Sequence, residues 1–256
     1  MKRALQYSLL GLYKLVSATG IFGTAWGRAF FDWAYLSYKA LFEAGDIRVL
    51  ASLISRGGAV IDVGANIGFF TRHFANWVGQ TGRVIAIEPE ELNVKRLSHM
   101  VLRQRLGKVV EIVQAVAAER GGTLKLKLNP MNPGDHRIAE EGVSVRAVCL
   151  DDLLAERQWP RVSLVKIDVQ GAEERVLTGA GQLLAKFHPA LFIEIDDPIL
   201  RSMGSSAERI FQHLAGSGYR IHRIQGRHIS TALEMSEALS LCRDGGYTDF
   251  LFLYHN

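Results

Sequence analysis

From residue 58 onward, short apolar runs alternate with longer segments of helical periodicity, and this alternation constrains the fold more than any other feature of the chain. The apolar runs predict buried strands at 59–63, 83–89, 109–117, 162–169, 190–195, 219–225 and 249–255. The periodic segments predict helices at 70–79, 91–107, 173–184 and 205–218. Strands that are apolar throughout are typical of a parallel sheet covered by helices on both faces. We therefore expect an α/β fold with a doubly wound, mainly parallel sheet.

Two departures from the alternation add detail. The last two strands follow each other with no clear helix between them, which predicts a final antiparallel strand inserted beside its neighbour. Segments 123–129 and 143–150 alternate apolar and polar residues, as half-exposed strands do. Between them lies a polar stretch of thirteen residues, 130–142, which we interpret as a loop long enough to be functional.

The first 48 residues have a different character. They hold six basic residues against three acidic ones, and so account for +3 of the formal net charge of +4. Residues 3–16 predict an amphipathic helix, and aromatic residues recur at helical spacing over 30–42. This N-terminal helical arm, residues 1–48, either packs on the main core or forms a membrane-interface or dimer surface. We assign residues 49–256 to a second unit, the main domain.

Composition narrows the classes of function. A chain of 256 residues with 48% hydrophobic and 22% charged residues is long enough to bury a full globular core. The basic excess lies in the arm and not on the main domain, which argues against nucleic-acid binding. Cys149 and Cys242 stand in apolar surroundings, without the spacing of a disulfide framework or a metal site. This cysteine usage fits a reducing compartment, so we expect a cytoplasmic protein, with the membrane face as an alternative location.

The stretch VIDVGANIGFFT, residues 60–71, places a carboxylate and two glycines where the first strand turns into a helix. Asp62 stands at the carboxyl end of that strand, and Gly64 and Gly68 allow a tight turn with room for a ligand. In sheets of this kind, ligands bind outside the carboxyl ends of the strands. The helix that follows offers free N–H groups at its N-terminus. The stretch therefore predicts a cofactor site.

Two classes of cofactor use such a turn. A dinucleotide fingerprint in register with Gly64 needs glycine at positions 66 and 69, where this chain has Asn66 and Phe69. The second strand ends in Glu88, whose carboxylate can accept hydrogen bonds from both hydroxyls of a ribose. The pattern thus favours a nucleoside cofactor other than a dinucleotide.

Asp62 to Gly68 together with Glu88 resembles the S-adenosylmethionine site of class I methyltransferases. The form DVGAN-x-G resembles one branch of that superfamily, the FkbM-like methyltransferases. Four further segments also resemble this branch in the right order: IAIEP, QAVAAERGGTLKL, CLDDLL and VKIDVQGAEERVLTGA. The resemblance covers roughly residues 40–256. It implies a Rossmann-like methyltransferase fold with a seven-stranded sheet, and S-adenosylmethionine-dependent O-methylation, often of sugars and other secondary metabolites.

The resemblance also implies roles for particular residues. Glu88 would hold the ribose, Ala115 and Val116 would flank the adenine, and Asp168 would face the methyl group or the acceptor. The methionine end would be held by Asp62 and by the turn and helix start that follow it, namely Gly64, Ala65, Asn66, Gly68 and Phe69.

An alcohol acceptor must lose a proton as it attacks the methyl group, so we looked for a general base. Asp168, which ends the fourth strand, Glu194, which ends the fifth, and His136 on the long loop are the candidates. Glu173 stands in the first turn of a helix, where the helix dipole alone favours an acid. No ligand spacing demands a metal.

Three other functions stay open. A nicotinamide-dependent oxidoreductase could use the same fold, a catalytically silent binding module could retain it, and the aromatic arm could make the chain a membrane-bound scaffold. The expected partner is a hydroxyl-bearing small molecule or glycan acceptor, and no nucleic acid. Peripheral membrane contact through the arm and a homo-oligomer are further expectations.

Overall fold

A computed structural model describes residues 47–129, 136–243 and 247–255. The predicted arm therefore lies almost entirely outside the described residues, and so does the first part of the predicted loop. Within the described residues, no helix combines the length and the apolar character needed to cross a membrane.

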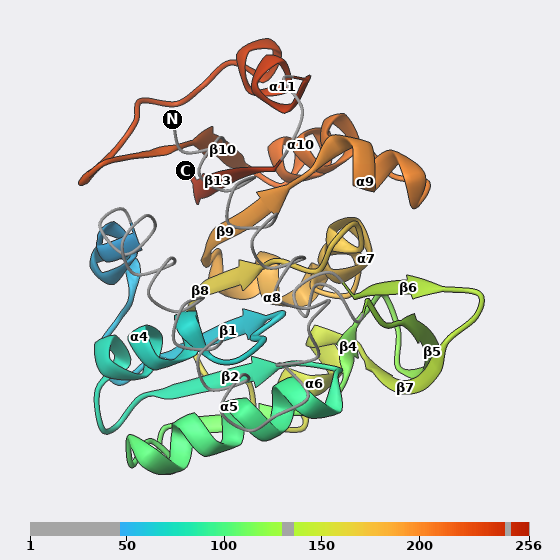
Figure 1. Cartoon of the computed structure of the whole chain (residues 1–256). Coiled ribbons are helices and arrows are strands. Elements are labelled where there is room, and N and C mark those ends of the chain that lie inside the picture. Colours follow the sequence, from blue (N-terminus) through green and yellow to red (C-terminus); the bar gives the residue numbers. More distant parts are fainter. Residues whose placement is uncertain (1–46, 130–135, 244–246, 256) are drawn as a thin grey trace, which may run out of the picture.

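A central seven-stranded sheet confirms the fold class predicted from the sequence (Figure 1). Its strands, in spatial order, are β10 (Tyr219–His222), β13 (Thr248–Tyr254), β9 (Ala190–Ile195), β8 (Val162–Ile167), β1 (Ala59–Val63), β2 (Arg83–Ile87) and β3 (Val110–Val113). β13 is antiparallel to both of its neighbours, and the pairs between β9 and β3 are parallel. The strand order reverses between β1 and β8, because β2 and β3 extend the sheet on one side of β1 whereas β8 and β9 extend it on the other. A ligand site is expected at such a point.

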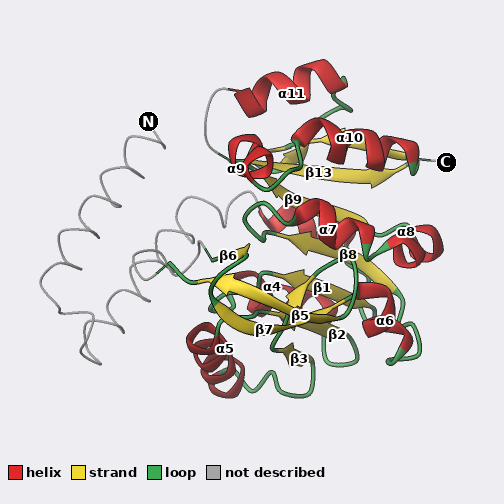
Figure 2. Ribbon diagram, turned by 90° about the vertical axis from the view of Figure 1, so that its right-hand side faces the viewer, coloured by secondary structure: helices red, strands yellow, loops and turns green. Residues whose placement is uncertain are grey.

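Helices cover both faces of the sheet (Figure 2). One face packs against the 3-10 helix η2 (Arg48–Leu53), α4 (Phe69–Val78) and α5 (Glu91–Arg103), together with the hairpin β11 (Ile224–Gln225) and β12 (His228–Ile229). The opposite face packs against α6 (Leu150–Ala155), α7 (Glu173–Thr178), α8 (Gly181–Phe187), α9 (Asp197–Ser202), α10 (Ala207–Gly216) and α11 (Met235–Arg243).

The alternation of side chains along each strand explains why the apolar runs are continuous. In β1, Ala59, Ile61 and Val63 enter the core on the α7 side, while Val60 enters the core on the α4 side. Asp62 points to the α4 face and is fully buried. β1 therefore contributes side chains to the hydrophobic cores on both faces of the sheet. Its only charged residue, Asp62, lies beneath the turn that follows the strand.

A separate four-stranded sheet, in the order β4 (Val116–Ala117), β7 (Val143–Val148), β5 (Gly122–Lys127) and β6 (Arg137–Ala139), corrects two predictions. The predicted strand 109–117 is two strands, because Val113 pairs with β2 whereas Val116 pairs with Ala147 in the smaller sheet. The predicted loop 130–142 contains β6, which pairs with β5.

Three helix predictions were also wrong in detail. α5 ends at Arg103, before Arg105 adopts the left-handed conformation, and not at 107. The helix predicted at 173–184 is divided into α7 and α8, with Gly179 and Ala180 between them. The chain passes so close to Ala118 there that a Cβ at Gly179 would lie 2.3 Å from the Ala118 carbonyl oxygen. α11 occupies the segment between the last two sheet strands, where no helix was predicted, and its short apolar face of Ala238 and Cys242 gave too weak a periodic signal.

Candidate active site

The turn after β1 brings the backbone of two strand ends into contact. Gly64 has φ +75°, and a Cβ there would lie 1.9 Å from the main-chain oxygen of Asp168, at the end of β8. Asn66 also has positive φ, and its side-chain oxygen accepts the N–H of Ile67 at 2.7 Å, which helps an asparagine to adopt this conformation. Only glycine fits at position 64, so a steric constraint explains the glycine that follows β1 in the sequence.

Asp62 supports this turn from inside the protein. Its Oδ2 accepts a hydrogen bond from Thr71 Oγ1 at 2.6 Å, and its Oδ1 lies 3.5 Å from Lys166 Nζ. Burial raises the pKa of the Asp62 carboxyl, while Lys166 and Thr71 act to lower it. The side chain is fully buried, so its predicted contact with the cofactor stays a prediction.

Glu88 lies at the end of β2, 4% exposed, and faces the same turn. Its Oε2 accepts the N–H of Asn66 at 2.8 Å, and its Oε1 accepts the N–H of Glu90 at 3.1 Å and the amide of Asn93 at 3.3 Å. Burial raises the pKa of Glu88 to about 7 despite these bonds. A carboxylate has about four acceptor positions, so roughly one remains on Oε2 for a ligand hydroxyl.

These groups fit S-adenosylmethionine. Glu88 retains acceptor capacity for a ribose hydroxyl, and Ala115 and Val116, which follow β3 beside it, are small and buried. α4 begins at Gly68 with no side-chain cap and no acidic residue in its first turn. The N–H groups of that turn suit a carboxylate such as the one at the methionine end.

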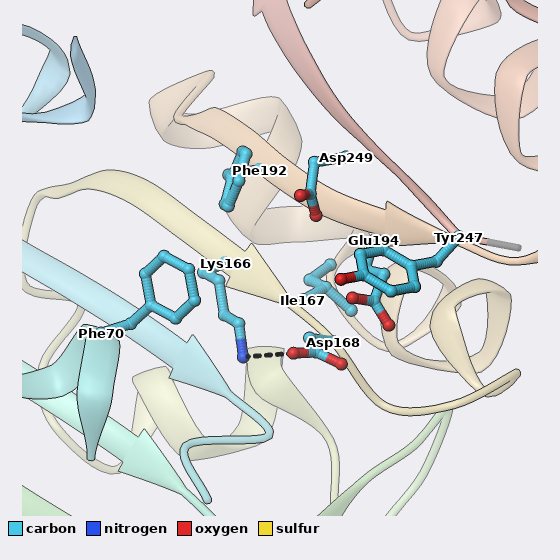
Figure 3. Close-up of a pocket in the computed structure, with 8 residues that line it drawn as sticks. All are labelled: Phe70, Lys166, Ile167, Asp168, Phe192, Glu194, Tyr247 and Asp249. Carbon is cyan, nitrogen blue, oxygen red and sulfur yellow. Dashed lines mark ion pairs between the residues drawn. The ribbon is translucent and has the colours of Figure 1, made fainter. Parts of the chain in front are cut away.

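Lys166 is a member of the site that the sequence reasoning missed. It stands on β8, is 3% exposed, and its Nζ donates to the carbonyl oxygens of Gly64 at 2.8 Å and Val63 at 3.3 Å. The ammonium group also lies 3.3 Å from Asp168 Oδ2, as Figure 3 shows by a dashed line. The available signal was a lysine inside the otherwise apolar run VSLVKI.

A pocket opens beside these residues at the carboxyl end of the sheet. It is lined by Phe70, Lys166, Ile167, Asp168, Phe192, Glu194, Tyr247 and Asp249 (Figure 3). The side-chain amide of Gln170 donates to Glu194 Oε1 at 2.9 Å and to Asp168 Oδ1 at 3.4 Å. Asp249 is the partner of Glu194 in the β9–β13 ladder. The structure therefore brings together two of the three predicted bases, Asp168 and Glu194.

His136, the third predicted base, does not line this pocket. Its Nδ1 accepts the N–H of Asn129 at 3.1 Å. Its catalytic role stays a prediction. Among the described residues, no group of three histidine, cysteine or acidic side chains could hold a metal ion.

Glu173 fixes the loop between β8 and α7. Its Oε1 accepts the N–H groups of Gly171 at 3.1 Å and Val169 at 3.4 Å, and its Oε2 has no hydrogen-bond partner. Gln170 and Gly171 both have positive φ in this loop. The contact of Glu173 with the loop, which the dipole interpretation overlooked, thereby places Gln170 between the two carboxylates. Burial raises the pKa of Glu173 to about 7.

The substitution Glu173→Gln is expected to flatten the pH dependence of stability. The folded pKa of about 7 exceeds the ordinary value of 4.5, so the stability from the protonated carboxyl is full below pH 4.5 and is lost as pH rises through 7. The loss amounts to about 3 kcal/mol at pH 8. Urea unfolding between pH 5 and pH 8 should show a smaller decline in the variant. The exposed control Glu156→Gln should show the same decline in the free energy of unfolding as the wild type. An equal decline in Glu173→Gln would contradict the raised pKa assigned to Glu173.

Comparison with known proteins indicates a methyltransferase. The family model described as Methyltransferase FkbM domain matches residues 62–221. Over 139 residues the chain is 27% identical to the hexuronic acid methyltransferase AglP of Haloferax volcanii, an alignment that covers 54% of this chain and 56% of the relative. The chain thus spans about half the length of the curated relative that it matches.

Similar solved structures include the methyltransferase FkbM of Methylobacillus flagellatus, with 18% identity and a TM-score of 0.48 over 77% of this chain and 43% of that one. Another is the O-methyltransferase TomG of Streptomyces achromogenes in complex with S-adenosylmethionine, with 13% identity and a TM-score of 0.48 over 83% of this chain and 80% of that one.

Proposed function

This chain belongs to the FkbM family of S-adenosylmethionine-dependent methyltransferases, and from that membership we propose that it methylates a hydroxyl group of a sugar or sugar-like acceptor. The observation that carries the proposal is the pair of pocket-lining carboxylates, Asp168 and Glu194, which both accept hydrogen bonds from the side-chain amide of Gln170. Carboxylates accept hydrogen bonds from hydroxyl groups and can take up their protons. The relative AglP, named for a hexuronic acid, supports a sugar-type acceptor.

The bound cofactor supplies a methyl group on a sulfonium, which is already a strong donor. The task of the chain is then to align the acceptor oxygen and to receive its proton. We favour Asp168 for this role, because its main-chain oxygen lies beside the turn at Gly64 and its side chain lines the pocket. Gln170 holds the carboxylates of Asp168 and Glu194 in one orientation.

The family match gives no support to a nicotinamide-dependent oxidoreductase. Methyl transfer from S-adenosylmethionine to any acceptor would contradict a catalytically silent binding module. We retain residues 49–256 as the methyltransferase domain, with the arm as a peripheral membrane contact, and both assignments are proposals.

The acceptor class is tested by methyl transfer from radiolabelled S-adenosylmethionine to neutral sugars, hexuronic acids, amino sugars and aliphatic alcohols. We expect labelled product from at least one sugar, and the label should survive mild alkali because a methyl ether resists hydrolysis, unlike a methyl ester. Label found only on nitrogen or in an alkali-labile ester would overturn methylation of a hydroxyl group. Cofactor binding without transfer to any acceptor would favour the silent module.

Substitution of each predicted base should identify the proton acceptor. Asp168→Asn is expected to lower kcat by about 10²–10⁴-fold, the usual contribution of a general base. Glu194→Gln and His136→Ala should have smaller effects, since neither group lies so close to the turn at Gly64. Steady-state kinetics with a productive acceptor gives the measurement. If all three variants retain full kcat, no side-chain base operates and alignment alone accounts for catalysis.

A further inference from the structure

Lys166 carries a charge that is expensive to bury. Its side chain is 3% exposed, on a strand with helices on both faces. A lysine in such a place is retained only when charged and polar groups surround its ammonium group. Four oxygens do so: the carbonyls of Val63 and Gly64, Asp62 Oδ1 and Asp168 Oδ2.

The sheet register explains why these groups meet. Asp62 and Lys166 are partners in the β1–β8 pair, so their side chains leave the sheet on the same face. Asp168 follows two residues after Lys166 and faces the same way. The ring of Phe70, from α4, lies 5.3 Å from Nζ and covers the group. Lys166 therefore contacts the cofactor turn on one side and a pocket carboxylate on the other.

We propose that Lys166 is a positioning residue for methyl transfer, which ties the turn after β1 to Asp168 and offsets the negative charge of Asp62 and Asp168. In the proposed reaction, the acceptor oxygen forms a bond to the methyl carbon as the S–CH3 bond breaks. The bonding electron pair stays on sulfur, so the cationic sulfonium becomes a neutral thioether, and the proton of the acceptor hydroxyl passes to the Asp168 carboxylate. Two carboxylates without a nearby cation would hold the cationic donor too firmly relative to the neutral product. One ammonium group between them reduces that preference. The proposal rests on the proposed function for the acceptor-side role of Asp168, but its test needs no acceptor.

The test is calorimetric titration of the full chain with S-adenosylmethionine and S-adenosylhomocysteine at pH 8. The variants are Lys166→Met and Lys166→Gln, which remove the charge, and Lys166→Arg, which keeps it. Leu164→Ala serves as the matched control, because Leu164 is fully buried two residues earlier on the same strand face and contributes no charge.

Both neutral variants should shift the affinity ratio towards the cationic donor by roughly fivefold, as expected for removing one charge near another at short range. Lys166→Arg should keep the ratio of the wild type, and Leu164→Ala should weaken both ligands equally. If Lys166→Met does not fold, Lys166→Gln provides the result, because its amide can still donate to Gly64. An unchanged ratio in the neutral variants would overturn the proposal.

The affinity ratio tests the role of Lys166 independently of the proposed function, which is tested by methyl transfer to an acceptor. A shifted ratio together with no transfer to any hydroxyl acceptor would support the role of Lys166 and refute O-methylation. An unchanged ratio together with a methylated sugar would refute the role of Lys166 and support the proposed function.

Discussion

The substitution Gly64→Ala is expected to abolish cofactor binding and to lower the free energy of unfolding by about 2–5 kcal/mol. Two effects add. The backbone at Gly64 has φ +75°, which disfavours any residue with a Cβ, and that Cβ would overlap the Asp168 carbonyl oxygen at 1.9 Å. The overlapping group is backbone at the end of a central strand, so it cannot rotate away. The turn, Asp168 and the pocket would all be displaced.

Gly204→Ala separates the two effects. Gly204 also has positive φ, at +81°, but nothing lies within 4 Å of the position of an added Cβ. This control should lose only about 1–2 kcal/mol from backbone strain and should bind S-adenosylmethionine normally. Urea unfolding and calorimetry on both variants give the comparison. Equal stability losses in the two, or full cofactor affinity in Gly64→Ala, would show that the close approach to Asp168 is unimportant.

The second large effect is expected for Glu88→Ala, which should weaken S-adenosylmethionine and S-adenosylhomocysteine by roughly 30-fold for each ribose hydroxyl bond that is lost. Both ligands contain the ribose, so both should be affected equally. Glu90→Ala is the matched control, because it removes a nearby carboxylate whose oxygens accept the N–H groups of Leu92 and Asn93 at the start of α5. Normal affinity in Glu88→Ala would remove Glu88 from the cofactor site.

The raised pKa of Glu88, about 7, adds a pH dependence to this binding. The charged carboxylate is the better hydrogen-bond acceptor, and it is lost as pH falls through 7. Cofactor affinity should therefore be highest at pH 8 and decline towards pH 6 in the wild type. The affinity of Glu88→Ala should vary less over that range, which calorimetry at several pH values would detect. A parallel decline in the two proteins would assign the effect to another group.

Particular elements show how far the sequence predicts the fold. β9, predicted at 190–195, has those bounds in the structure, because Pro189 precedes the apolar run and Asp196, the N-cap of α9, follows it. The strand predicted at 109–117 was wrong as a single strand, because its two halves pair in different sheets. Periodicity reports that a segment is buried and extended, but not which partner strand receives it.

Some residues of the candidate site could be predicted from the sequence, and others could not. Gly64, Asn66, Gly68 and Glu88 could be found from the sequence, because a tight turn and a carboxylate at a strand end restrict residue type at single positions. The partners of Lys166 and Gln170 could not be found in this way. A lysine in an apolar strand signals a buried charge, but neither it nor a glutamine in a loop indicates which groups it contacts. Their roles come from contacts with residues far away in the chain.

The sequence by itself determined the doubly wound sheet and the position of the glycine turn after β1, since backbone sterics and hydrophobic period are local properties. Its motifs determined the family. Tertiary structure alone decided that Asp62, Lys166 and Asp168 form one charged group, and that Glu173 holds the loop that joins Asp168 to Glu194. The physical reason is that a buried charge is tolerated only beside its partners, and pairing between strands, not order along the chain, decides which partners it has.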